Sequence, residues 1–198
     1  VTLGTFLLWF GWFGFNGFSQ LAMGTFDDVN AISKIAVNTH LAGAAGTVTG
    51  AALTRLIGGK TDIVMMLNGA LAGLVAITAE PLTPGPITAM VIGSIGAVIM
   101  YYGTKLLENL GLDDVVGAIP VHMFAGIFGT LVVPFTNSET SFGTQFVGVI
   151  SVCVFSFVLS WITFSTLKST VGLRISKAAE KLGTDKAEVG VIAYSIRD

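Results

Sequence analysis

The sequence is poor in charge and in cysteine, and each shortage narrows the class of protein. Charged residues make up 11% of the 198 positions, whereas soluble domains carry about 25%. Hydrophobic residues reach 53%, which favours a membrane protein. The net charge of −2 comes without a basic stripe, which argues against nucleic-acid binding. The single cysteine, Cys153, lies in an apolar run and excludes both an intrachain disulfide and a zinc cluster.

Several motifs of enzymes are also missing from the sequence. It contains no nucleotide-binding loop, nucleophile elbow or metal-binding pair, so we expect neither an enzyme nor a bound cofactor. The chain begins at Val1 without an initiator methionine or a basic segment, so its first apolar run is not a signal peptide. We expect these residues to belong to a longer polypeptide.

Long apolar runs separated by turn-rich connectors predict six membrane-spanning helices and therefore an all-α membrane protein. Most runs approach the ~20 residues needed to cross hydrocarbon. The third has 16 residues, and we expect protein rather than lipid around it. The six runs are Thr2–Leu21, Ile32–Leu56, Ile63–Thr78, Ile87–Leu107, Val115–Pro134 and Gln145–Leu167.

Charges at the ends of these runs predict their orientation, because positively charged loops stay cytoplasmic. The opposite ends hold one cation, Lys34, together with acidic residues. We therefore expect the first span to run outward, residues 1–170 to form the membrane domain, and residues 171–198 to form a cytoplasmic tail. The cations on the cytoplasmic side are Arg55, Lys60, Lys105, Lys168, Arg174, Lys177, Lys181 and Lys186.

His122 lies inside the fifth apolar run, where an ionisable side chain costs free energy. Ionisable groups at membrane depth usually face the protein interior or a water-filled cavity. Two interpretations are open: a histidine hydrogen-bonded between helices, or a pore group that accepts and donates a proton. Pro120 precedes it and loosens the local helix hydrogen bonding, which favours a widened lumen.

An aromatic face is predicted on the first run. Trp12, Phe15 and Ser19 are spaced i, i+3 and i+7, so they lie on one side of a helix. Aromatic rings and a hydroxyl are what a small-cation site needs, because ring faces attract cations. The alternative is an interfacial aromatic belt, which suits Trp9 well.

Two further features have mainly structural interpretations. Asp113 and Asp114 precede the fifth run, where an acidic pair usually caps a helix and complements its dipole. His40, on the second run, is predicted to be a structural histidine.

These motifs together resemble the ammonium transporter (Amt/Mep/Rh) family along nearly the whole chain. Trp12-Phe13-Gly14-Phe15-Asn16 with Ser19 resembles the family's sixth transmembrane helix, and Asp113-Asp114 with Pro120-Val121-His122 resembles its tenth. Other similar segments are Ala36-Val37-Asn38-Thr39 (seventh helix), Leu67–Thr78 (eighth) and Val171-Gly172-Leu173-Arg174 (exit from the eleventh).

The resemblance implies a specific placement and specific roles. The six spans would be helices six to eleven of an eleven-span homotrimer subunit, with one pore per subunit. Trp12 and Ser19 would help form the outer ammonium site, Phe15 would be one ring of a paired-phenylalanine gate, and His122 would be the second of twin pore histidines. The partner histidine, the other gate ring and a supporting aspartate would belong to the absent first half.

Departures from the family pattern keep a second function open. Met123 stands where the family usually has glycine and would narrow or reposition the lumen, and Gly117 replaces an aspartate. The tail, with Gly183-Thr184-Asp185 and Glu188-Val189-Gly190, departs from the family's usual elements. The alternative is therefore an ammonium sensor that acts through a fused signalling domain or a cytoplasmic regulatory protein. A channel for a neutral solute would leave the Trp12 face unexplained.

Overall fold

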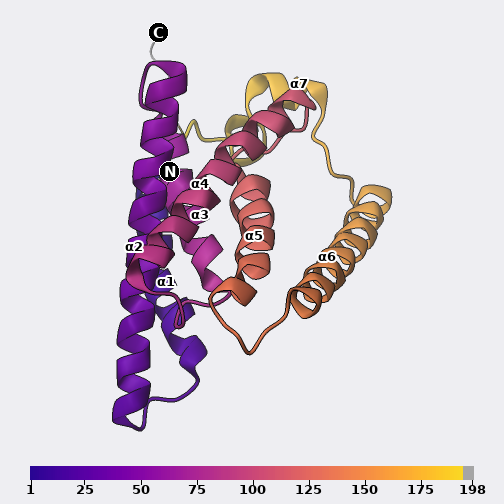
Figure 1. Ribbon diagram of the computed structural model, residues 1–198. Coiled ribbons are helices and arrows are strands. Elements are labelled where there is room, and N and C mark those ends of the chain that lie inside the picture. The colour runs from indigo at the N-terminus through magenta and orange to yellow at the C-terminus, as the bar shows by residue number, and fades with distance from the viewer. Residues whose placement is uncertain (194–198) are drawn as a thin grey trace. The chain divides into compact units, whose positions relative to one another are not determined.

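The computed structural model describes residues 1–193, which contain helices and no strand (Figure 1). The all-α class is confirmed, and each predicted span contains a helical segment. The last residues of the predicted tail, 194–198, lie outside the described residues. The α-helices are α1 (Thr2–Gly17), α2 (Phe26–Gly58), α3 (Ile63–Thr78), α4 (Pro86–Asn109), α5 (Ala125–Val132), α6 (Phe142–Thr170) and α7 (Lys177–Leu182).

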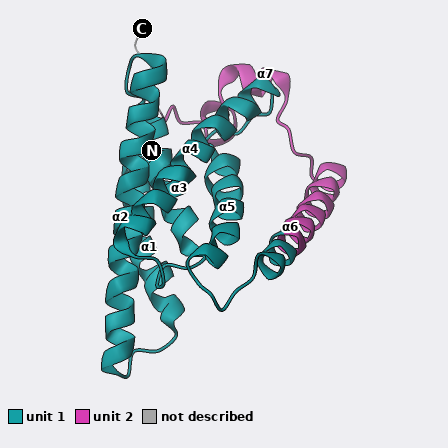
Figure 2. Ribbon diagram, viewed as in Figure 1, with its two compact units in different colours: residues 1–149 teal, residues 150–198 magenta. Residues whose placement is uncertain are grey.

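The chain divides into two compact units, residues 1–149 and 150–198 (Figure 2). The first unit holds α1 to α5 and the first residues of α6. The second holds the rest of α6, then α7 and the π-helical segment η4 (Asp185–Val189). α6 ends at Thr170. The division into a membrane domain, residues 1–170, and a cytoplasmic tail stays a prediction.

Local hydrogen bonding sets where α2 and α3 begin. α2 starts at Phe26 rather than Ile32 because Thr25 and Asp28 form a capping box: the Asp28 N–H donates to Thr25 Oγ1 at 3.1 Å, and the Asp28 carboxylate accepts from the Thr25 N–H at 3.0 Å. Asp62 caps α3 by accepting from the N–H groups two and three positions further on, at 2.8 and 3.1 Å. The bounds of α3 are those predicted.

The end of α1 differs from the predicted span. The helix stops at Gly17, and a 3-10 turn, η1 (Phe18–Gln20), leads to Leu21 with φ of 59°. A leucine in this left-handed region is uncommon and marks a fixed chain reversal. The Gln20 amide donates to Asp28 Oδ1 at 3.3 Å, which ties the reversal to the start of α2.

Glycines let α2, α3 and α4 approach backbone to backbone. A Cβ on Gly69 would lie 2.6 Å from the Gly46 carbonyl oxygen, and one on Gly50 would lie 2.8 Å from the Met65 carbonyl oxygen. A Cβ on Gly93 of α4 would likewise overlap the backbone of Ala42 in α2. These three helices pack most extensively in the fold, as small residues allow between membrane helices (Figure 1).

The fifth predicted span is not one continuous α-helix. A π-helical segment, η2 (Ile119–Phe124), precedes α5, and a 3-10 turn, η3 (Val133–Phe135), follows it. Pro120 has no N–H to donate, so the regular helical ladder is interrupted at this point. π-Helical turns are frequent at functional sites. His122 lies inside this segment.

Two described helices are long and apolar enough to cross a membrane on length and composition alone. These are α4, with a mean hydropathy of 1.5, and α6, with 2.2. α3 and the segment Ile119–Phe135 are apolar but shorter.

The second unit has its own local contacts. The Ser176 hydroxyl accepts from the Ala179 N–H at 3.2 Å and caps α7. Asp185 Oδ2 accepts from the Ala193 N–H at 2.9 Å. Backbone N–H groups, Ala193 first and Lys186 next, hold the pKa of the Asp185 carboxyl below its usual value.

Candidate functional site

Trp12 on α1 is held by a hydrogen bond to another helix. Its indole Nε1–H donates to Thr78 Oγ1 at 2.8 Å, and Thr78 in turn donates to the Leu74 carbonyl at 2.7 Å, near the end of α3. The half-buried indole therefore has a satisfied polar edge, and its orientation is set by the end of α3.

Two residues of the predicted face, Trp12 and Phe15, lie on α1, whereas Ser19 lies beyond its end in the 3-10 turn η1. The rings of Trp12 and Phe15 lie 5.6 Å apart between centroids at 56°, and Phe15 is 63% exposed. The exposed Ser19 hydroxyl donates to the Phe15 carbonyl at 3.0 Å. Because this bond uses the hydroxyl proton, the oxygen keeps acceptor lone pairs, which is the polarity that an N–H-bearing cation needs.

His122 lies against the same tryptophan. The two rings are 6.4 Å apart between centroids, with planes only 21° from parallel. The structure thus brings together two of the features predicted separately from the sequence, on α1 and on the interrupted fifth span.

His122 also lines a cavity of about 410 Å³. Most of its wall is apolar and includes Leu71 of α3 and Val121 of η2. Its polar groups are few and come from His122, Asn68 and Thr5. His122 therefore adjoins both the Trp12 ring and a mostly apolar cavity, an arrangement typical of small-molecule sites.

The second histidine stands in a different aromatic group. His40 of α2 lies 5.6 Å from Trp9 and 6.2 Å from Phe13 between ring centroids, stacked with the latter at 20°. These two rings belong to α1 but are not those that contact His122. The prediction that His40 is structural stays a prediction.

Asp114 caps the interrupted span, as predicted for the acidic pair. Its two carboxylate oxygens accept from the N–H groups of Ala118 and Ile119, each at 2.8 Å. Met123 directly follows the pore candidate His122; its side chain is 49% exposed and is not part of the wall of the 410 Å³ cavity. Among residues 1–193, no cluster of three or more His, Cys, Asp or Glu is placed to hold a metal ion.

The family model for the Ammonium Transporter Family matches residues 1–194. The chain belongs to the ammonium transporter family. Members of this family are membrane proteins that transport ammonium.

Curated relatives in the family agree over nearly the whole chain. It is 41% identical over 212 aligned positions to ammonium transporter Amt2 of Archaeoglobus fulgidus, covering 97% of this chain and 44% of the relative. It is 38% identical over 193 positions to a putative ammonium transporter of Synechocystis, covering 96% of this chain and 44% of that protein. The chain thus spans less than half the length of these relatives.

Solved structures in the family share the fold. A protein described as a Sensor Amt Protein superposes with a TM-score of 0.86 at 35% identity, covering 94% of this chain and 48% of that one. Mep2 of Candida albicans superposes with a TM-score of 0.81 at 27% identity, covering 96% of this chain and 45% of its own.

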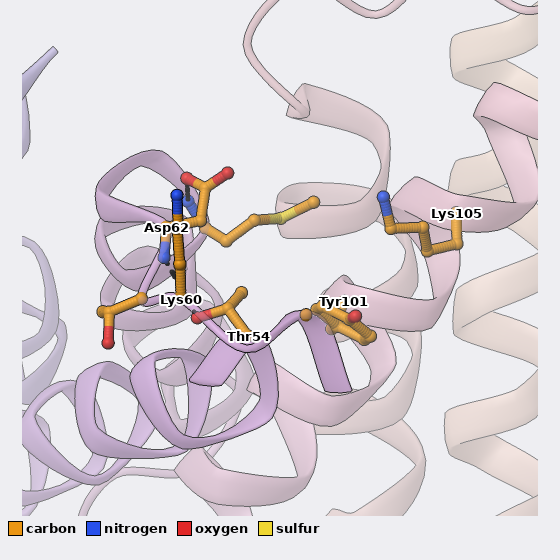
Figure 3. A pocket seen from close by; sticks show the side chains of 8 residues that line it. Thr54, Lys60, Asp62, Tyr101 and Lys105 are labelled. Atoms are coloured by element: carbon orange, nitrogen blue, oxygen red, sulfur yellow. Dashed lines mark hydrogen bonds between the residues drawn. The ribbon is translucent and has the colours of Figure 1, made fainter. Parts of the chain in front are cut away.

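A second cavity, of about 350 Å³, lies where α2, α3 and α4 meet the α2–α3 loop of this ammonium transporter family chain (Figure 3). Lys60, Asp62 and Lys105 line it, with the hydroxyl-bearing side chains of Thr54 and Tyr101. Its cations share the space with carboxylates: Asp62 is in the wall, and Lys105 Nζ pairs with Glu108 Oε2 at 3.0 Å. Opposite charges therefore offset one another here.

Two polar residues of the first site were not assigned a role from the sequence. The sequence identifies Thr78 only as the end of a family-like segment, because its contact with Trp12 joins positions far apart in the chain. Asn68 belongs to the same segment and lines the cavity beside His122. The sequence feature that could have indicated their roles is the presence of these two polar residues in an otherwise apolar run.

Proposed function

We propose that this chain is the C-terminal half of an ammonium transporter, with its six spans as helices six to eleven and its tail in the cytoplasm. Ammonium is recruited near Trp12 and Ser19, passes Phe15 and loses its proton. Ammonia then moves past His122 while the proton follows the imidazoles. The observation that carries this proposal is the contact between Trp12, which adjoins the cation-attracting face, and His122, which adjoins the cavity.

The energetics favour deprotonation over passage of the intact ion. A charge at the centre of a membrane costs roughly 3 to more than 10 kcal/mol, depending on the reference. Removing a proton costs about 1.4 kcal/mol per pKa unit between the group and the solution. An amine with a pKa a few units above neutrality is therefore deprotonated for about 3–4 kcal/mol, and the apolar cavity then receives a neutral molecule.

The test is electrical current on an ammonium step across liposomes that contain the full-length protein. We expect His122→Ala to reduce the current or to weaken selectivity against potassium. His40→Ala is the matched control, because it removes the other intramembrane imidazole without touching the Trp12 contact. If His122→Ala retained both the current and the selectivity, the proposed role of His122 would be wrong.

A second candidate function is ammonium sensing. It is favoured by the structural likeness to a protein described as a sensor and by the tail's departures from the family pattern. In a sensor, ammonium binds at the Trp12 face without flux, and the tail relays the state to a signalling domain or a cytoplasmic regulator. Saturable ammonium binding in the absence of any current would support the sensor and contradict the transporter.

Family membership also suggests the assembly, a homotrimer with one pore in each subunit. Mass measurement of the full-length protein in detergent tests it. A monomer or dimer would contradict this part of the proposal without affecting the role of His122.

A further inference from the structure

Asn68 makes a contact that links α3 to the turn in front of the pore histidine. Its side-chain amide Nδ2–H donates to the Val116 carbonyl at 3.0 Å. The side chain is 6% exposed, and it lines the cavity that His122 also lines. Asn68 is therefore a buried polar group whose partner belongs to the interrupted span and not to its own helix.

The turn that receives this bond depends on a glycine. Gly117 has a φ of 72°, in the region that favours glycine, and its N–H donates to the Asp114 carbonyl at 3.1 Å. A Cβ added at Gly117 would lie 2.8 Å from Asn68 Nδ2. The Asn68 amide therefore needs a glycine at position 117, because a Cβ there would displace it.

The same turn leads directly into the segment that carries the imidazole. The Asp114 carboxylate accepts from the N–H groups of Ala118 and Ile119, and the Val121 N–H donates to the Gly117 carbonyl at 3.1 Å. His122 follows at the next position. Hydrogen bonds therefore connect the turn to the residues directly before the imidazole.

We propose that Asn68 is a positioning residue for His122. By holding the Val116 carbonyl, it fixes the Asp114–Gly117 turn against α3 and sets where the π-helical segment begins. The imidazole is thereby kept against Trp12 and at the wall of the cavity. This inference rests on the proposed conduction past His122, although the placement of the ring is measurable without transport.

The direct test is the imidazole signal of His122 in full-length protein labelled with 15N-histidine, assigned by its loss in His122→Ala. We expect Asn68→Ala to change the chemical shift of this signal. Asn38→Ala is the matched control: Asn38 is also a buried helical asparagine, and it donates to the Pro81 and Pro84 carbonyls at 2.9 and 2.8 Å, in the α3–α4 loop. It should leave the His122 signal in place, even though it removes two hydrogen bonds.

Transport gives a second readout. We expect Asn68→Ala to lower the maximum current by about two- to tenfold, the equivalent of one hydrogen bond, and to change its pH profile. Asn38→Ala should keep the wild-type pH profile. If Asn68→Ala fails to fold, Asn68→Ser replaces it, because the shorter hydroxyl side chain remains polar but does not span to Val116.

A double-mutant cycle separates positioning from general damage. Gly117→Ala acts on the same contact, so its effect on the His122 signal and on the current should be less than additive with that of Asn68→Ala. Full additivity, or an unmoved His122 signal in Asn68→Ala, would overturn the proposal. A moved signal in a protein that carries no current would support the positioning role and contradict the proposed transport function.

Discussion

The indole of Trp12 and the imidazole of His122 lie nearly parallel, 6.4 Å apart between ring centroids. One ring stands on α1 and the other on the interrupted fifth span, and Thr78 of α3 holds the indole from a third direction. Three separate segments therefore converge on one aromatic pair. In the proposed transporter, a substitution in any of these segments should therefore alter ammonium affinity or current.

Thr78→Val tests the hold on Trp12. The substitution preserves shape but leaves the indole N–H without its acceptor, which costs about 1 kcal/mol or more, equivalent to a factor of about five in affinity. We expect the half-saturating ammonium concentration to rise by at least that factor in liposome current measurements.

The control for this substitution is Thr47→Val. The Thr47 hydroxyl donates to the Gly43 carbonyl of its own helix at 2.9 Å, so the variant loses a local bond of the kind that Thr78 also makes. Equal effects of the two variants would show that the bond to Trp12 contributes nothing to binding.

Gly69→Ala should destabilise the packing of α2 on α3. The added Cβ would lie 2.6 Å from the Gly46 carbonyl oxygen, and overpacking of this kind costs about 1–3 kcal/mol. Gly58→Ala, near the end of α2, meets nothing within 4 Å and should be neutral or stabilising by up to about 1 kcal/mol. Thermal unfolding of the full-length protein in detergent measures both. A loss of stability in both variants would refute the argument from close approach.

Much of the fold follows from the sequence because apolar runs and their flanking turns are local signals. The predicted limits Ile63 and Thr78 are those of α3, since Asp62 provides a recognisable cap. The pairing of Trp12 with Phe15 on α1 was also predictable, because helical spacing places residues three apart on one side. The position of Ser19 was not, because α1 ends at Gly17 and Ser19 lies in a 3-10 turn.

The remaining features depend on contacts between distant segments. The π-helical segment around His122 follows a turn held by Asn68, which lies on another helix. Similarly, helical spacing alone does not distinguish Trp9 from Trp12 as the neighbour of His122; the packing of α1 decides it. Such features arise from tertiary structure, which periodicity does not encode.

Asp28 should make the start of α2 sensitive to acid. Hydrogen bonds from the Thr25 hydroxyl and then the Gln20 amide hold the pKa of the Asp28 carboxyl below its usual value. A lowered folded-state pKa means that the stabilisation is complete above the unfolded-state pKa of about 3.9 and is lost as the pH falls through the folded value. The unfolding temperatures of wild type and Asp28→Asn should therefore differ at neutral pH and converge below about pH 4.

The Thr25→Ala background checks the origin of this effect. Removing the hydroxyl takes away the largest cause of the shift, so the pH-dependent difference that Asp28→Asn produces should shrink in this background. If the pH-dependent difference were equally large in this background, the Thr25 hydroxyl would not be what lowers the pKa of Asp28.

Met123→Ala tests whether this residue narrows the lumen beside His122. Because the side chain is 49% exposed, its removal should change the unfolding free energy by no more than about 0.5 kcal/mol. If Met123 obstructs conduction, the liposome current should rise while selectivity against potassium is retained. An unchanged current would place Met123 outside the path.

The contact between α2 and its neighbours also bears on how the membrane stays insulated. Where Gly46 meets Gly69 and Gly93 meets Ala42, the backbones leave no room for a methyl group, and hence none for a water molecule or an ammonium ion. We therefore expect no path for ions or water along these seams. In the proposed transporter, these close helix contacts confine ammonia and its proton to the route past His122, because the helices are sealed against one another elsewhere.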